Sequence, residues 1–297
     1  MSSGLSWFVI ILTFAYIFGN FGLLMWARSK RIAGAAQQSL GHEYDGIQEL
    51  DTPLPRWWLW IFIGSIVFAL VYLVLYPGLG NFPGVLGWTS SGQLRNEVAQ
   101  ADAQYGPLYA AFASKPIPEL IKDPKAMEMG QRLFANNCAQ CHGSDARGGV
   151  GFPNLTDNDW LWGGDPDTIQ TTILAGRNGI MPPMAAVIGE ENVPAVVAYV
   201  QSLSGMKVDP AKAAVGKEKF NTVCMACHGM DGKGNQALGA PNLTDDIWLF
   251  GNDPATIAEG IYKGRNLMMP AHQNILGDQK AHVVAAYVYG LSNKGGQ

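Results

Sequence analysis

All four cysteines of the 297-residue chain lie in two Cys-x-x-Cys-His motifs. The motif residues are Cys138, Cys141 and His142 in the first copy, and Cys224, Cys227 and His228 in the second. Two thiols at this spacing lie on one helical turn, where each can add to one vinyl group of a porphyrin, and the adjoining His can then bind the iron. The sequence therefore predicts two covalently attached c-type haems.

A Cys-x-x-Cys pair also occurs in thioredoxin-like redox sites and as half of a zinc site. Here 82 residues separate Cys141 from Cys224, against the roughly 15 to 20 of a zinc ribbon. A His also follows each second cysteine directly. Both observations favour haem attachment over zinc.

The two motifs belong to a longer internal repeat. The segments Pro-Asn-Leu-Thr, Asp-Pro and Gly-Arg-Asn follow each motif in the same order at an offset of 88 residues, whereas the cysteines are offset by 86. Such self-similarity indicates duplicated domains. We place the first domain at residues 123–204 and the second at 205–297, and expect each to be all-α without strands.

Four Asp-Pro pairs predict helix starts, because Asp at the N-cap accepts a backbone N–H and Pro fits the first helical position. The four caps are Asp123, Asp165, Asp209 and Asp253. Apolar residues at helical spacing predict a third helix near 193–203 in the first copy and near 280–291 in the second. We expect this third helix to close each domain on itself.

Each copy also offers one Met-Pro segment, at Met181 and at Met269. A Met ligand raises the reduction potential of a haem towards that of electron carriers. Their matched positions distinguish these two from the other methionines, which we interpret as core packing. Following the order of the chain, we expect Met181 to bind the iron opposite His142, and Met269 the iron opposite His228.

Rival ligands lie three residues further on, at Met184 and His272. A lone His is more often solvated than bound to a metal, so we expect His272 to stay away from the iron. The remaining histidines, His42 and His282, have no cysteine partner and are expected at the surface or at an interface.

Two apolar blocks precede the repeat. Residues 5–27 and 57–76 each reach the roughly 20 residues that cross a bilayer, and tryptophans lie at their ends. Buried core helices are the alternative, but soluble helices seldom lack a polar stripe for five turns. No charge precedes the first block, which indicates a retained helix rather than a cleaved signal peptide.

The cations near the helix ends predict the topology. Arg28, Lys30, Arg31 and Arg56 all lie in the connecting loop. By the positive-inside rule residues 28–56 are cytoplasmic and both termini lie outside, in the disulfide-permissive space where such thiols are usually handled. We therefore expect residues 1–88 to be a membrane anchor and 89–122 a linker, whose peripheral helix is interrupted near Gly106-Pro107.

With a Met-Pro segment after each Cys-x-x-Cys-His-Gly, residues 123–292 resemble two tandem class I cytochrome c domains. The stretches 42–47, 53–58, 76–80 and 87–88 resemble, more narrowly, the dihaem CcoP subunits of cbb3-type haem-copper oxidases. The resemblance implies an all-α fold in which a transmembrane helical hairpin precedes the two cytochrome c domains. Some members of that family have one membrane helix, whereas this sequence shows two.

The resemblance also implies partners. Such a subunit receives electrons from a cytochrome c donor and passes them towards the monohaem cytochrome c subunit and the catalytic haem-copper subunit. It resides in the bacterial inner membrane, with its lipid bilayer contacts at the anchor and its haem domains in the periplasm. No nucleic-acid partner is expected.

Irons ligated by His and Met have no open coordination position, so we expect electron transfer without catalysis by this chain. Two alternatives stay open from the sequence: a free-standing membrane-tethered dihaem carrier, and a dihaem peroxidase with a vacant or displaceable ligand.

Residues 123–204 carry four Lys or Arg against nine Asp or Glu, a net charge of −5, and 205–297 carry nine against eight, a net of +1. The first copy is therefore the expected dock for a basic donor.

Overall fold

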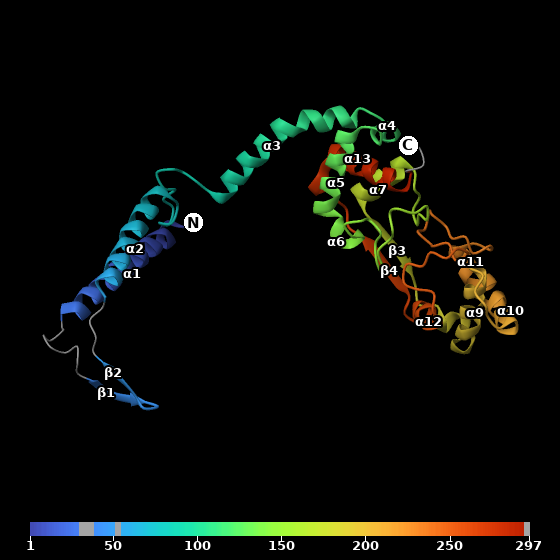
Figure 1. Ribbon diagram of the computed structural model, residues 1–297, viewed down its shortest axis with the longest axis horizontal. Coiled ribbons are helices and arrows are strands. Elements are labelled where there is room, and N and C mark those ends of the chain that lie inside the picture. Colours follow the sequence, from blue (N-terminus) through green and yellow to red (C-terminus); the bar gives the residue numbers. More distant parts are fainter. Residues whose placement is uncertain (30–38, 51–54, 294–297) are drawn as a thin grey trace. The chain divides into compact units, whose positions relative to one another are not determined.

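The computed structural model describes residues 1–29, 39–50 and 55–293 (Figure 1). They form two compact units, Met1–Gln104 and Tyr105–Gln297. Lys30 and Arg31 lie outside the described residues, as does the side chain of His42. The expectations for these three side chains stay predictions.

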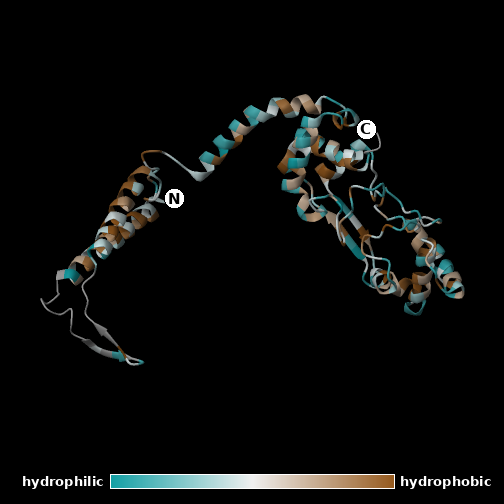
Figure 2. Cartoon of the chain, in the orientation of Figure 1, coloured by the Kyte–Doolittle hydropathy of each residue, from teal (hydrophilic) through white to brown (hydrophobic). Residues whose placement is uncertain are grey.

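Two long apolar helices make up most of the N-terminal unit. α1 spans Ser3–Ser29 and α2 spans Arg56–Leu75, and both are long and apolar enough to cross a membrane. Their residues, largely apolar in Figure 2, are almost all exposed, so neither is the core helix of a soluble domain. The structure thus agrees with two membrane-spanning helices.

A hairpin lies between these helices, which was not expected from the sequence. β1 (Ser39–Tyr44) pairs antiparallel with β2 (Ile47–Leu50). Asp45 and Gly46 form the turn with φ of 51° and 82°, as a two-residue hairpin requires.

The segment after α2 folds back onto the ends of both membrane helices. The backbone N–H of Val85 donates to the carbonyl of Val74 at 2.9 Å, and that of Asn81 donates to Ser6 Oγ at 2.9 Å. Gly84, at φ +73°, sits so close that a Cβ would lie 2.5 Å from the Leu75 carbonyl oxygen. Only glycine fits such a position.

A single helix, α3, spans Ser90–Ala113 and joins the two units. We expected a break near Gly106-Pro107, but the helix continues through Pro107, so this prediction was wrong. A proline removes one intrahelical hydrogen bond, and a helix of 24 residues tolerates that loss. The last turn of α3 buries Phe112 in the core of the second unit.

The second unit is predominantly helical, as expected. Before the repeat lies α4 (Ile117–Leu120). The first copy forms α5 (Pro124–Asn137), α6 (Ala139–His142), α7 (Pro166–Ala175), α8 (Ala185–Ile188), a 3-10 turn (Glu190–Asn192) and α9 (Val193–Leu203). The second copy forms α10 (Pro210–Lys219), a π-helical turn (Phe220–Cys224), α11 (Met225–His228), α12 (Pro254–Lys263) and α13 (Gln273–Ser292). All four Asp-Pro helix starts are confirmed, since each Asp side chain accepts at least one backbone N–H.

The third helix of each copy packs against the other copy. In Figure 1, α13 lies beside α5 and α7 of the first copy, whereas α9 packs on α10 and α12 of the second. We expected each third helix to close its own copy, and this prediction was wrong. Residues 123–204 and 205–297 are repeats of sequence, but the packing units combine elements of both.

A two-stranded ribbon connects these packing units. β3 (Arg177–Met181) pairs antiparallel with β4 (Arg265–Met269) along its whole length. We expected no strand in either copy, and this too was wrong. Among the described residues of its own copy neither strand has a partner, so the ribbon forms where the two copies meet.

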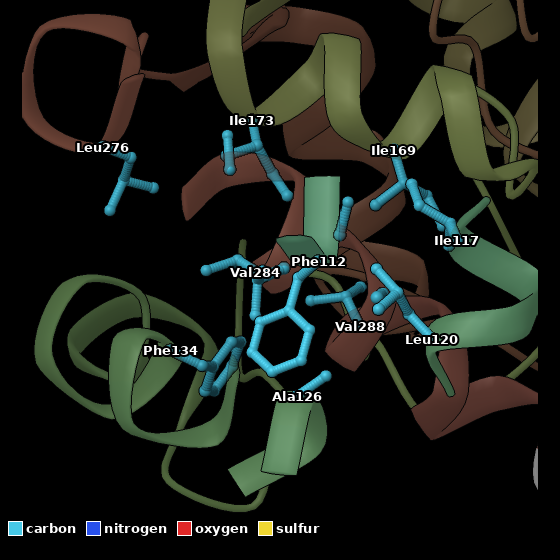
Figure 3. Packing of buried hydrophobic residues seen from close by; sticks show 14 of the residues in the cluster. Phe112, Ile117, Leu120, Ala126, Phe134, Ile169, Ile173, Leu276, Val284 and Val288 are labelled. Carbon is cyan, nitrogen blue, oxygen red and sulfur yellow. The ribbon is translucent and has the colours of Figure 1, made fainter. Parts of the chain in front are cut away.

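Two separate hydrophobic cores result. The first collects buried residues of α3, α4, α5, α7 and α13, among them Phe112, Phe134, Ile173 and Val284 (Figure 3). The second collects residues of α8, α9, the π-helical turn and α12. Each core backs one Cys-x-x-Cys-His motif.

Candidate functional site

The first cysteine motif sits at the end of α5. Cys138 caps that helix, and Cys141 and His142 lie on the single turn of α6. His142 Nδ1 lies 3.0 Å from the carbonyl oxygen of Pro153. A carbonyl only accepts hydrogen bonds, so Nδ1 carries the proton and the lone pair of Nε2 is free to bind a metal.

The second motif repeats this arrangement. A π-helical turn leads into Cys224, and α11 carries Cys227 and His228. His228 Nδ1 lies 3.2 Å from the carbonyl oxygen of Pro241. The same tautomer follows, so both histidines present Nε2 as the available ligand atom.

Burial fixes the protonation of both motifs. It lowers the pKa of His142 and of His228, which keeps the imidazoles neutral, the form that binds iron. Burial, with the neighbouring Cys141, raises the pKa of Cys138 to about 11, and burial also raises that of Cys224. A thioredoxin-like pair would need a lowered thiol pKa, so these pairs do not suit that alternative.

The first motif opens onto a cavity of about 330 Å³. Its wall includes Cys138, Cys141 and His142 of the first copy, together with Met269 and His272 of the second. We expected Met269 near His228. The structure instead brings it to the first motif.

The matching exchange occurs at the second motif. Met181 and Met184 of the first copy pack on the second core, which also contacts Cys224. We expected Met181 near His142, so both pairings inferred from chain order differ from the structure. The physical reason is the ribbon, because each strand crosses to the other copy before its methionine.

His272 is half-buried rather than simply solvated. Its backbone N–H donates to the Ile173 carbonyl at 3.0 Å, as that of Met184 donates to the Ile261 carbonyl at 2.8 Å. Its Nδ1 is buried and has no hydrogen-bond partner among the residues that the structure describes. The expectation of a solvated side chain was wrong, since His272 lies in the first cavity beside Met269.

The residues of the first cavity fit a haem. The cavity is lined by a neutral His Nε2, two thiols at the attachment spacing and a thioether. The rest of its lining is largely apolar and aromatic and includes Trp160 and Trp162. The orphaned Nδ1 of His272 points to a group that is still to be accommodated there. At the second motif, buried Trp248 Nε1 likewise has no hydrogen-bond partner within the described part of the chain.

One cation that the sequence reasoning did not assign to the site lies in this cavity. Arg177 lines it, donates from Nε to Thr172 Oγ1 at 2.8 Å, and stacks 5.1 Å from the ring of Trp162. The recurring Gly-Arg-Asn segment was the signal that could have identified Arg177 and its equivalent Arg265.

One carboxylate of the cavity was also missed. Asp159 lines both this cavity and a second one of about 360 Å³ formed by loops of the two copies. Burial, followed by the charges of Asp245 and Asp157, raises the pKa of Asp159 to about 6. The repeat could not have indicated it, because the equivalent position in the second copy is Ile247.

His282 joins three segments of the second unit. Its Nδ1 lies 2.9 Å from Gln170 Oε1 in α7, and its Nε2 lies 2.9 Å from the carbonyl oxygen of Lys115. His282 was expected at the surface or at an interface, and the structure places it between segments of the second unit.

Two family models match the chain. The N-terminal domain of cytochrome oxidase-cbb3, FixP, matches residues 36–83. Cytochrome c oxidase, cbb3-type, subunit III, matches residues 125–200 and again 211–288. The second model therefore recognises both copies of the repeat.

Full-length relatives give the same result. The chain is 54% identical to the Cbb3-type cytochrome c oxidase subunit CcoP of Rubrivivax gelatinosus, over 89% of this chain and 87% of the relative. It is 41% identical to subunit FixP of Azorhizobium caulinodans, over 86% and 93%. It is 38% identical to subunit CcoP of Cereibacter sphaeroides, over 84% and 93%.

Proposed function

The chain belongs to the CcoP and FixP family of cbb3-type cytochrome c oxidase subunits, and on this premise we propose that it carries two c-type haems and takes no part itself in the reduction of oxygen. As a member of that family it is an electron-transfer subunit with cytochrome c domains. The number of haems and the absence of catalysis go beyond the family assignment.

The two cysteine pairs hold the haems covalently in this proposal. Cys138 and Cys141 bind one porphyrin, and Cys224 and Cys227 bind the other. Each haem, when bound, supplies a one-electron iron couple. The protein orients it by fixing the imidazole of His142 or His228 through its Nδ1 hydrogen bond to a proline carbonyl.

The distal ligands are exchanged between the copies. We assign Met269 to the iron held by His142, and Met181 to the iron held by His228. The single observation that carries this assignment is that Met269 lines the same cavity as Cys138, Cys141 and His142. The placement of Met181 on the second core, which also contacts Cys224, supports the other half.

With one histidine and one methionine assigned to each iron, the bound haems would offer no open position to oxygen or peroxide. The subunit therefore acts as a relay, and oxygen chemistry belongs to the catalytic haem-copper subunit. A cytochrome c donor lies upstream, and the monohaem cytochrome c subunit lies between this relay and the catalytic subunit. α1 and α2 anchor the relay in the bacterial inner membrane, with both haem sites in the periplasm and residues 28–56 in the cytoplasm.

One preparation tests this function. The full-length chain, purified in mild detergent with its complex, should give two haems per chain in a pyridine haemochrome assay and should co-purify with a haem-copper subunit. A value of one haem per chain contradicts the cofactor count. Two haems without any co-purifying oxidase subunit would instead support a free-standing carrier.

A further inference from the structure

Two arginines occupy equivalent places at the starts of β3 and β4. Arg177 lies directly opposite Met269 in the ribbon, and Arg265 lies directly opposite Met181. Residues directly opposite each other on antiparallel strands face the same side, and all four side chains are half-buried. Each arginine therefore sits beside the methionine assigned to one iron.

Both guanidinium groups stack on an aromatic ring and donate a hydrogen bond to the preceding helix. Arg177 stacks 5.1 Å from Trp162 and is bonded to Thr172 of α7. Arg265 stacks 4.4 Å from Phe250, and its Nη2 donates to the Thr256 carbonyl of α12 at 2.9 Å. Trp162 and Phe250 are themselves equivalent positions, 88 residues apart.

Arg177 is the only Lys or Arg among the described residues that line the first cavity. A haem carries two propionate carboxylates, and arginine pairs with carboxylates in a bidentate, charge-assisted geometry. Arg177 is therefore the residue of the first cavity that would pair with these carboxylates when a haem is bound. Arg265 is its equivalent in the second site.

The two arginines differ in their ion pairing. Arg265 Nη1 lies 3.3 Å from Glu259 Oε2, whereas within the described ranges Arg177 has no Asp or Glu at ion-pair distance. The position equivalent to Glu259 in the first copy is Thr171. The second site thus holds a carboxylate that the first lacks.

Glu259 also contacts a second cation. Lys263 Nζ lies 3.0 Å from Glu259 Oε1, and the Lys263 side chain is 74% exposed against 22% for that of Arg265. Water screens the exposed lysine far more than the half-buried arginine. The electrostatic effect of Glu259 inside the site is therefore mainly exerted on Arg265.

We propose that Glu259 is a positioning residue that lowers the reduction potential of the haem attached at Cys224 and Cys227, by offsetting the charge of Arg265. An oxidised haem carries one more positive charge than a reduced one. The positive charge of an arginine beside it disfavours the oxidised state and raises the potential, and a protein carboxylate on that arginine offsets part of this effect. This inference rests on the proposed haem loading and ligand exchange.

The test is a spectroelectrochemical titration of the full-length dihaem protein in detergent. Glu259→Gln should move one of the two redox waves upward and leave the other in place. The shift should change the equilibrium constant for electron exchange between the haems by about threefold, because a charge at a partly buried site acts through an effective dielectric constant well below that of water. Lys263→Gln is the matched control, and it should leave that wave unchanged or move it downward, because Glu259 then pairs with Arg265 alone.

A reciprocal variant assigns the waves. Thr171→Glu places a carboxylate at the equivalent position beside Arg177 and should lower the wave that Glu259→Gln leaves in place. If Glu259→Gln moves neither wave, or moves both equally, in a protein with two haems, the role of Glu259 is refuted. A wild-type protein with fewer than two haems would refute the proposed function instead, so the two failures are distinguishable.

Discussion

Gly179 of β3 lies directly opposite Leu267 of β4, the residue that occupies its own position in the second copy. Because the two residues are equivalent, a pseudo-twofold axis passes through this pair. The other pairs of the ladder obey the same twofold relation: Arg177 pairs with Met269, and its equivalent Arg265 pairs with Met181. Each strand therefore ends beside the opposite copy, and the end of β4 places Met269 at the first motif.

Gly176 tests how tightly this crossing is built. It has φ +70°, and a Cβ there would lie 2.4 Å from the Met269 carbonyl oxygen. Gly176→Ala should therefore strain the backbone at this position and also push the two strands of the ribbon apart. Together these effects should lower the free energy of unfolding by about 3 kcal/mol. Urea unfolding followed by circular dichroism measures this loss.

The control for that prediction is Gly205→Ala. Gly205 also has positive φ, +78°, but nothing lies within 4 Å of its Cβ position. This variant should pay only the backbone cost of about 1 kcal/mol. Equal losses in the two variants would show that the Met269 carbonyl does not crowd Gly176.

Asp159 predicts a pH-dependent stability. Its pKa in the folded chain, about 6, lies above the unfolded value near 3.9, so burial of this carboxyl favours the protonated form. The contribution of the neutral Asp159 carboxyl to the free energy of unfolding is fully present below about pH 4 and is lost as the pH rises through 6. Asp159→Asn should therefore be more stable than wild type at pH 7.5, by on the order of 1 kcal/mol after allowance for solvent screening at this half-exposed group.

The reference point for this variant is pH 4, where thermal melts of Asp159→Asn and wild type should nearly coincide. The second copy, which has Ile247 at the equivalent position, indicates that an uncharged residue is tolerated there. A stability difference of the same size at pH 4 and pH 7.5 would remove the ionisation of Asp159 from the account.

The local features of this fold were accessible from the sequence. Asp123 accepts backbone N–H groups of Lys125 and Ala126, as an Asp-Pro cap predicts from four residues alone. The apolar blocks that became α1 and α2 are equally local, because bilayer length and the absence of charge are read within each segment. The cysteine motifs likewise needed no partner to be identified.

The packing of each third helix and each methionine on the opposite copy could not be predicted from the sequence, because it depends on contacts between two similar copies. A third helix such as α9 presents much the same apolar face as α13, so a pattern of residues does not say which first helix it covers. The direction of the chain towards the opposite copy is set at Gly176 and Gly264, where it turns into the ribbon with φ of +70° and +73°. β3 and β4 have five residues each and pair with each other, and strands this short show no periodic pattern that would identify them from the sequence.

The topology of the anchor follows from charge and is tested with reporter fusions. With Arg28 in the last turn of α1 and Arg56 at the start of α2, the cations flank the loop between the membrane helices, so a periplasm-dependent reporter fused at residue 40 should be inactive, and one fused at residue 120 should be active. The two fusions control for each other in expression and insertion. Activity at residue 40, or silence at residue 120, would contradict the hairpin with a cytoplasmic loop.

The ligand exchange gives the last prediction, and it is sharpest in a protein with one haem. Replacing Cys224 and Cys227 by Ala should leave only the haem at Cys138 and Cys141. In that background Met269→Ala should abolish the sulfur-to-iron charge-transfer absorption and lower the reduction potential, because the iron loses the thioether that lines its cavity. Met181→Ala should leave the band in place.

Two further variants in the same background separate ligation from general damage. Met230→Ala removes a methionine that is 73% exposed and should change neither the band nor the potential. His272→Ala should also keep the band, since we assign the thioether of Met269 to the iron, although His272 shares the cavity. Ligation by chain order makes the opposite prediction, in which Met181→Ala abolishes the band and Met269→Ala preserves it. If the single-haem protein shows no such band before substitution, and its spectrum changes in His272→Ala but not in Met269→Ala, the ligand role passes to that imidazole.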